Sequence, residues 1–365
     1  SNIANDQLRQ AAARAYNTMT AEIYRPFRDV FAPVATIPTY TPQEAIAELE
    51  HAVGLGFKVI MIRGALPRPL PAAGRDFGVT FETTGTREVP YYVDAIGLDS
   101  PYDYDPFFQR CVDLHIAVTG HGGAHEWADR KSVNNNVFNH IGHFAQANHV
   151  MCKGVFLGGL PKKFPSLNFA FLEGGVGYGV NLLWDLVGHW EKVTPSAMLE
   201  HLNPAKTDFG KLKELVVKYG DPRTKALAEE IVDALPKKAV EPVDDFWGIS
   251  SKRELVDMFT RNFYFGCEAD DPVTAWAFDK RMGAKLKAVF SSDISHFDVP
   301  VMADVLPEAY EMVEKGWLDE EDFREFMFSN AVELHGKMNP DFFKGTTVER
   351  EAAAVLEGAK LAVAG

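Results

Sequence analysis

Ionisable side chains stand where several apolar runs of this sequence end. They are Arg63, His121 with His125, Glu173, and Asp293 with His296, and Glu268 is a weaker instance. Neutral imidazoles and carboxylates are ligands that Zn²⁺, Mn²⁺ and Fe²⁺ take in proteins. If the ends of these runs meet in space, the sequence predicts a site for a divalent metal ion.

The apolar runs alternate with helical segments, which is the pattern of βαβ units and a parallel sheet. The clearest unit is the β-branched run 30–42, the helix 43–56 and the apolar run 57–64. Further strands are expected at 115–123, 168–175, 263–268 and 287–293, a long loop at 65–104, and helices at about 4–24, 136–152 and 307–335. The carboxyl ends of parallel strands lie at one edge of a sheet, where the chemistry of such proteins sits.

Most of these residues also have a structural interpretation. A lone histidine at a strand end, such as His121, is more often a hydrogen-bonded structural residue than a ligand. Asp293 fits the N-cap of a following helix, and Arg63 can pair with a buried acid instead of a substrate carboxylate. Glu173 is harder to explain structurally, because a carboxylate that ends an apolar strand is costly unless it is paired or bound to metal.

Two more features concern histidines. His140 and His143 are three residues apart in an expected helix, so they share a face. That spacing suits a pair of metal ligands, although a partly exposed amphipathic helix would show it too. His296 follows Asp293 by three residues and could orient it or contact a substrate.

The composition narrows the class of protein. The chain has 365 residues and a formal net charge of −14, which argues against nucleic-acid and anionic membrane partners. No apolar run approaches the roughly 20 residues of a spanning helix. Cys111, Cys152 and Cys267 are far apart, as expected of reduced, buried cysteines in a cytoplasmic protein. P-loop, GxGxxG and GxSxG motifs are absent.

Several segments together resemble the amidohydrolase superfamily, in the amidohydrolase-related branch that includes aminocarboxymuconate semialdehyde decarboxylase. The segments are FAPVATIP, GFKVIMI, DPFFQRCVDLHIAVTGHGG, GVFLGGLPKKFPSLNFAFLEGGVGYG, AVFSSDISHFDVP and SNAVELHG. The resemblance implies a metal-dependent (β/α)₈ TIM-barrel-like α/β fold. It also implies a ligand at His121, which ends the fifth barrel strand, and a ligand or general base at Asp293, which ends the eighth.

The chain departs from this family at Glu173, where the decarboxylases carry an acid/base histidine. A glutamate needs a raised pKa to transfer protons near neutral pH. It could instead bridge two ions, as in family members that resemble this variant and hold two iron ions or iron and manganese. A dinuclear oxygenase component, with ligands at His121, His125, His140 or His143, Glu173 and Asp293, is therefore an alternative.

A second departure lies at the start of the chain. The His-x-His or Glu-x-His pair of the family's first strand has no counterpart before residue 115, and six strands are expected where the barrel has eight. We therefore expect the first one or two βα units to be absent from this chain. A non-catalytic partner subunit of a hetero-oligomer is the resulting second alternative.

The leading hypothesis is a metal-dependent hydrolase or decarboxylase that acts on a small carboxylate, amide or lactone with one or two ions of Zn, Fe or Mn. Asp293, His296 and Glu173 are the expected catalytic residues, and Arg63 and Trp127 are expected to bind substrate. Residues 1–365 are expected to form a single domain with a helical insertion around 185–260, in a homo- or hetero-oligomer.

Overall fold

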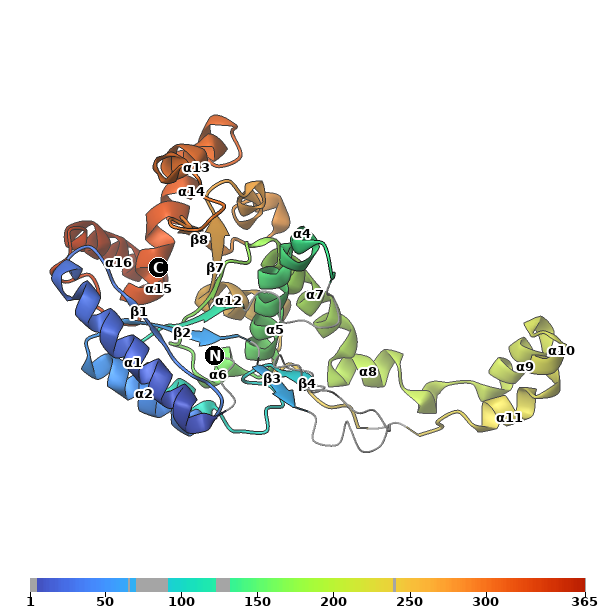
Figure 1. The fold of residues 1–365 in the computed structure, drawn as a ribbon. Helices are drawn as coiled ribbons and strands as arrows, with labels where there is room; N and C mark the ends of the chain where they lie inside the picture. Colours follow the sequence, from blue (N-terminus) through green and yellow to red (C-terminus); the bar gives the residue numbers. More distant parts are fainter. Residues whose placement is uncertain (1–4, 65, 70–90, 123–131, 239–240, 365) are drawn as a thin grey trace. The chain divides into compact units, whose positions relative to one another are not determined.

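The computed structural model describes residues 5–64, 66–69, 91–122, 132–238 and 241–364 (Figure 1). Residues Ser1–Leu183 and Val256–Gly365 form one compact unit, and Trp184–Leu255 form a second. Among the described residues, no helix combines the length and the apolar character that crossing a bilayer requires.

The first unit is built on a six-stranded parallel sheet in the order β1-β2-β5-β6-β7-β8. The strands are β1 (Val34–Thr36), β2 (Val59–Arg63), β5 (Val118–His121), β6 (Phe169–Leu172), β7 (Phe263–Glu268) and β8 (Lys287–Ser291). Each strand pairs with the next parallel strand along the chain, as in a (β/α) barrel, whereas a doubly wound sheet reverses its strand order. The expected α/β class with parallel strands is confirmed.

Helices connect these strands. In the first unit they are α1 (Asp6–Tyr24), α2 (Pro42–Gly54), α3 (Asp105–Asp113), α4 (Asn136–His140), α5 (His143–Leu157), α6 (Leu160–Lys163), α13 (Val305–Glu314), α14 (Glu320–Arg324), α15 (Asn330–Gly336) and α16 (Glu349–Ala364). Two more helices, α7 (Gly177–Val193) and α12 (Lys252–Asn262), contain residues of both units, because the boundaries between the units fall within them.

The structure corrects two expectations about these elements. The expected loop 65–104 contains two short antiparallel strands, β3 (Leu66–Pro69) and β4 (Tyr91–Asp94). The single helix expected at 136–152 is two helices, α4 and α5, because Gly142 adopts a left-handed conformation with φ 78° between them. A glycine takes this conformation at little cost, so the chain can turn there.

The core beside the sheet is rich in phenylalanine. Phe169 and Phe171 of β6 and Phe263 and Phe265 of β7 are fully buried. The ring centroids of Phe171 and Phe263 lie 5.3 Å apart, and those of Phe259 and Phe263 lie 5.1 Å apart. Burying each ring contributes about 2 kcal/mol to stability, so these contacts hold β6 and β7 firmly against the core.

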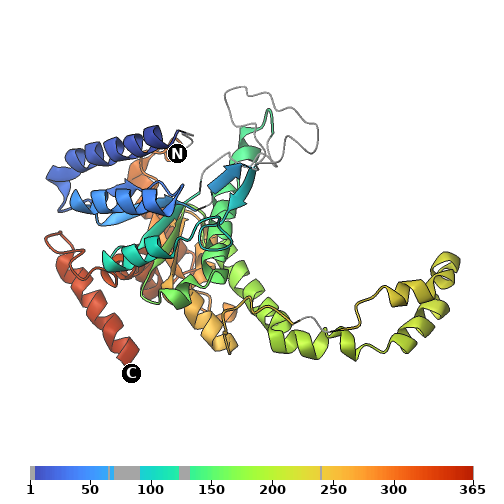
Figure 2. The same ribbon diagram turned by 90° about the horizontal axis from the view of Figure 1, so that it is seen from below.

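Helix α1 packs on the sheet edge through polar side chains. It runs beside α2 (Figure 2), where Arg9 donates to both carboxylate oxygens of Glu44 at 2.8 and 2.7 Å. The Asn17 side chain bonds both the backbone N–H and the C=O of Thr36, each at 2.9 Å. Asn17 thereby satisfies the edge of β1 as a neighbouring strand would.

The apolar stripe of α1 faces outward instead. Leu8, Tyr16, Met19 and Ile23 are spaced so that they fall on one face of the helix, and each is at least 50% exposed. The buried side chains on this helix are Arg9, Asn17, Thr20 and Ala21. Burial of the polar members is tolerated where their hydrogen bonds are made within the protein, as they are for Arg9 and Asn17.

The second unit is helical. It contains α8 (Pro195–His201), α9 (Phe209–Tyr219), α10 (Pro222–Ala226) and α11 (Ala228–Asp233), and α9 and α11 contact each other. Its bounds lie close to those of the insertion expected around 185–260. The description of the whole chain as a single domain stays a prediction.

Candidate metal centre

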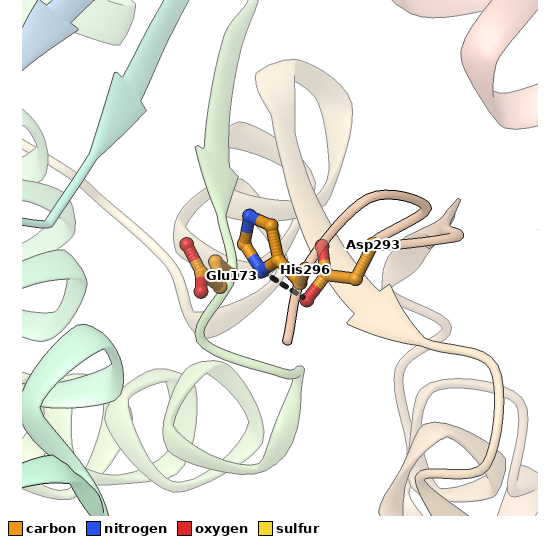
Figure 3. A group of neighbouring side chains, drawn as sticks. All are labelled: Glu173, Asp293 and His296. Carbon is orange, nitrogen blue, oxygen red and sulfur yellow. Dashed lines mark ion pairs between the residues drawn. The ribbon is translucent and has the colours of Figure 1, made fainter. Parts of the chain in front are cut away.

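Three side chains from the ends of two strands converge in the first unit. Glu173 directly follows β6, and Asp293 and His296 follow β8. One potential ligand atom from each lies within 4.8 Å of the other two, and Figure 3 shows the three side chains together. The Nδ1 of His296 lies 3.6 Å from Oδ2 of Asp293. Two carboxylates and one imidazole at this spacing can share one metal ion.

His121, the last residue of β5, lies beside this group of three. Its Nε2 contacts Oε2 of Glu173, and its Nδ1 lies 2.7 Å from the backbone oxygen of Gly122. The second contact fixes the orientation of the imidazole ring, as the outer nitrogen of a metal-ligating histidine usually requires. The structure thus places His121 and Asp293 on either side of Glu173.

The backbone around Glu173 is held by local contacts. Asn148 is fully buried and its Nδ2 donates to the backbone oxygen of Leu172 at 2.5 Å. A Cβ atom on Gly174 would lie 2.7 Å from that same Nδ2, so this position requires glycine. Glu173 itself has a left-handed φ of 57°. Such a conformation costs a non-glycine residue of order 1 kcal/mol and occurs most often at functional sites.

Asp293 also has a left-handed backbone, with φ 47°, and Ser295 follows with φ 88°. The backbone N–H of His296 donates to the Asp293 carbonyl at 2.9 Å, which closes a tight turn. The next helical turn in the described chain begins only at Met302. Asp293 is therefore in a turn at the strand end and does not cap a helix there, which removes the N-cap interpretation.

Burial and neighbouring negative charge raise the pKa of two carboxyl groups at this site. Burial and then the charge of Glu173 raise the pKa of Asp293. Burial and then the charge of Asp293 raise the pKa of Glu268, which ends β7, to about 7. The pKa of His121 is raised, mainly by its hydrogen bond to Glu173. Negative charge thus accumulates where β5 to β8 end.

A divalent cation fits this donor set. Carboxylates that repel one another in a partly buried place are stabilised when a cation lies between them. Glu173, Asp293 and His296 supply the closest group of donors, and His121 lies next to them. Oxygen-rich sets with imidazole suit Mn²⁺, Fe²⁺ and Zn²⁺.

The other two expected histidine ligands lie outside the group of three. The ring of His140 packs edge-on against Phe144 at 5.6 Å and against Phe297 at 6.4 Å, and Phe144 packs in turn against His121 at 5.6 Å. His143 is buried at the first position of α5. His140 therefore reaches the site through an aromatic contact, and the roles of both histidines as ligands stay predictions.

Arg63 and His121 share a cavity of about 680 Å³. The two residues are register partners, since Arg63 ends β2 and His121 ends the adjacent β5. Other walls come from α1, from the end of β1 and the segment that follows it, from β2 and from Leu66. This cavity adjoins the candidate metal centre and is large enough for a small-molecule ligand.

Two of the expected site residues, His125 and Trp127, lie outside the described residues.

The sequence indicates the roles of two other residues at the site, Glu268 and His296, less clearly than the structure does. Glu268 was the weaker strand-end acid, and His296 was expected to act on Asp293 or substrate without a place among the ligands. The spacing of Asp293 and His296, three residues apart in a turn, was the signal available for the second.

No protein-family model matches the sequence, and no curated protein sequence matches it. Solved structures do resemble the fold. Dihydroxybenzoic acid decarboxylase from Polaromonas sp. JS666, solved with bound manganese and the inhibitor 2-nitroresorcinol, is 19% identical with a TM-score of 0.54. The match covers 94% of this chain and 80% of that protein.

Two further structures are similar to the same extent. A 2,6-dihydroxybenzoate decarboxylase in complex with 2,6-dihydroxybenzoate is 17% identical with a TM-score of 0.52, and the match covers 91% of this chain and 79% of that one. An amidohydrolase from Mycobacterium avium subsp. paratuberculosis K-10 is 15% identical with a TM-score of 0.52, over 90% and 65%. The chain therefore has the α/β fold of these amidohydrolases and decarboxylases, in agreement with the resemblance read from its sequence.

Proposed function

We propose that this protein is a metal-dependent enzyme that acts on a small carboxylate, with decarboxylation favoured over hydrolysis. The convergence of Glu173, Asp293 and His296 at the carboxyl ends of parallel strands carries this proposal. The preference for decarboxylation is supported by the activities named for two proteins of the same fold.

Each residue at the site then has a chemical role. A bound divalent ion would polarise a substrate oxygen and offset negative charge that develops during bond cleavage. Glu173, Asp293 and His296 would hold it. Asp293, whose pKa is raised by burial, would also take or return a proton, and His296 at 3.6 Å would orient its carboxylate. Arg63 would attract the substrate carboxylate toward His121.

The test combines metal content with turnover. We expect close to one equivalent of Mn, Fe or Zn in purified protein, and CO₂ release from 2,6-dihydroxybenzoate or a related hydroxybenzoate, lost in Asp293→Asn. His189→Ala is the control, because His189 is exposed in the second unit. A protein that binds no divalent ion at micromolar concentrations would refute the proposal. Metal binding without turnover of any small acid would favour a non-catalytic subunit instead.

A second candidate is an oxygen-activating enzyme with two ions. Glu173 favours it, because a carboxylate can bridge two metals where a neutral imidazole cannot, and Glu268 and His121 lie next to the group of three. Two equivalents of iron, with an absorbance change when the reduced protein meets O₂, would support this candidate. Redox-silent zinc at full occupancy would exclude it.

We also propose that the protein is cytoplasmic and oligomeric, with a small molecule as its partner in catalysis. The three buried, free cysteines are in keeping with a reducing compartment. Sedimentation of the purified protein would measure its oligomeric state directly.

A further inference from the structure

A second cavity, of about 440 Å³, lies at the amino ends of the strands. Pro33 and Lys58 line it, and they directly precede β1 and β2. Arg63, at the other end of β2, lines the cavity beside the candidate metal centre. The two cavities are therefore at opposite ends of the same strand, and a ligand in the second would not touch the metal centre.

Hydrogen bonds join the walls of this second cavity. The walls are residues 28–33, Gly56 with Lys58, and residues 342–348, which precede α16. The backbone N–H of Thr347 donates to the Asp29 carbonyl at 3.2 Å. The ammonium group of Lys58 donates to the carbonyls of Asp341 and Phe342 at 3.1 and 2.5 Å. The cavity is thus held open by defined contacts between segments that are distant in the sequence.

The lining of the cavity carries more positive than negative charge, although the whole chain has a net charge of −14. Arg28, Lys58 and Lys344 line it, with Asp29 as the one acid among its described lining residues. Lys344 is exposed, and its ammonium lies 3.9 Å from the exposed carboxylate of Asp341. Such an excess of cations favours an anionic ligand.

Arg28 and Lys58 are oriented by backbone carbonyls. Nη2 of Arg28 donates to the Leu55 carbonyl at 2.7 Å. The guanidinium lies over Gly56, where an added Cβ would come within 2.8 Å of Nη1. Within the described parts of the chain, neither Arg28 nor Lys58 forms an ion pair with a carboxylate. Positioned cations of this kind are the groups that bind carboxylate and phosphate oxygens.

These two cations also lie close enough to repel each other. Burial lowers the pKa of Lys58, the charge of Asp341 acts in the opposite direction, and the positive charge of Arg28 lowers this pKa further. An anion bound between Arg28 and Lys58 would offset their repulsion.

Apolar side chains on the cavity wall are accessible to a ligand. Val30 and Phe31 are 55% and 56% exposed, and Val348 is 36% exposed. The ring of Phe31 packs edge-on against Tyr24 and Phe27, with ring centroids 5.9 and 6.5 Å apart, which fixes its position. Exposed apolar groups beside positioned cations suit a ligand that has both an apolar body and a charged end.

We propose that this cavity is a binding site for a small organic anion. The carboxylate or phosphate group of the ligand lies between Arg28 and Lys58, and its apolar body lies against Val30, Phe31 and Val348. The proposed ligand site is independent of the metal centre and of the proposed enzymatic function, because it uses none of their residues.

Calorimetry on the metal-free full chain tests this proposal with phenyl phosphate and phenylacetate. Inorganic phosphate, acetate and benzyl alcohol serve as probes of the charged end and of the apolar body alone. We expect at least one of the two aromatic anions to bind at least about fivefold more tightly than each partial probe. The tighter of the two identifies the preferred charged group, and either result supports the proposal. No binding of either anion at millimolar concentrations overturns it.

Arg28→Gln removes the guanidinium charge and keeps an N–H donor for the Leu55 carbonyl. We expect it to weaken binding of the aromatic anion at least about tenfold, the effect of losing a hydrogen bond to a charged group. Arg25→Gln is the matched control, because Arg25 is an exposed arginine of the same segment and does not line the cavity. An equal loss in both variants would show general electrostatic attraction and overturn the proposal.

A second variant guards against misfolding of the first. Thr347 is exposed and lines the cavity, so Thr347→Glu brings a carboxylate to the cations without entering the core. We expect this variant to weaken binding at least about tenfold as well. Unchanged binding in Arg28→Gln or in Thr347→Glu overturns the proposal.

Arg63→Gln separates the two cavities, because Arg63 lines only the cavity beside the metal centre. Binding that persists in Arg63→Gln and is weakened in Arg28→Gln supports the proposed site. The reverse pattern places the ligand near the metal centre and overturns it. A protein that binds no divalent ion would refute the enzymatic proposal and leave this result unchanged.

Discussion

The imidazole Nε2 of His121 contacts the carboxylate Oε2 of Glu173, which joins the ends of the adjacent strands β5 and β6. The two residues are 52 positions apart in the sequence (173 − 121). Their contact extends the group formed by Glu173, Asp293 and His296 across four consecutive strands of the sheet.

This contact predicts a pH-dependent contribution to stability. Because Glu173 raises the pKa of His121, the pair stabilises the metal-free fold most below the ordinary histidine pKa of about 6.5. The contribution is lost as the pH rises through the raised pKa. Glu173→Gln should therefore destabilise the protein most at about pH 5.5 and least at about pH 9, by at most about 1 kcal/mol because the imidazole is partly exposed. Urea unfolding at both pH values measures the difference, and an equal effect at both would contradict it.

Removing single donors should weaken metal binding. We expect Asp293→Asn and His296→Ala to lower Mn²⁺ affinity at least about tenfold each, because the first removes the negative charge of one potential ligand and the second removes another ligand altogether. Electron paramagnetic resonance of free Mn²⁺ gives the affinity, and His189→Ala serves as the control. Unchanged affinity in both variants would place the metal elsewhere.

Glu268 predicts a pH dependence of stability opposite to that of a carboxyl whose pKa is lowered on folding. Its pKa is raised to about 7, so the folded protein binds this proton more tightly than the unfolded chain does. Stability from this group is present below pH 4.5 and is lost as the pH approaches and passes 7. Glu268→Gln should therefore gain stability relative to the natural protein at about pH 8 and little at about pH 4.5. We expect about 1 kcal/mol, reduced from the full shift because Glu268 is only partly buried and water screens its charge.

The measurement for Glu268→Gln is chemical unfolding of the metal-free protein, with Glu241→Gln, an exposed glutamate of the second unit, as the control. Added Mn²⁺ should cancel the gain if the ion lies close to Glu268, since it offsets the same repulsion. A variant that is less stable than the natural protein at pH 8 would show that Glu268 is attracted by its surroundings.

Asn17 predicts a stability effect far from the candidate metal centre. Asn17→Leu removes the bonds to the backbone of Thr36 and to Glu48, which leaves part-buried backbone groups at the edge of β1 without these partners. We expect a loss of about 3 kcal/mol in the free energy of unfolding. Gln10→Ala, an exposed change on the same helix, should cost less than about 0.5 kcal/mol. Urea unfolding of both variants tests the contrast, and similar losses would mean that the edge contact is unimportant.

The sequence determined the strands and the acids at their ends. Apolar runs such as 263–268 are local signals, and β7 spans those same residues. Strand ends are local too, so Glu173, Glu268 and Asp293 could be named as candidates before any fold was known. A parallel arrangement followed from the alternation of strands and helices, and it predicted that these ends share one edge.

The tertiary structure decided which candidates meet and what surrounds them. No local pattern tells that Glu173 lies within reach of both His121 and Asp293, because those distances depend on strand order and on two left-handed backbone turns. The sequence also does not show which face of α1 is buried, since its regular apolar stripe is exposed and several of its polar residues are buried. Polar burial depends on partners such as Glu44 and Thr36, which only the folded chain brings to that helix.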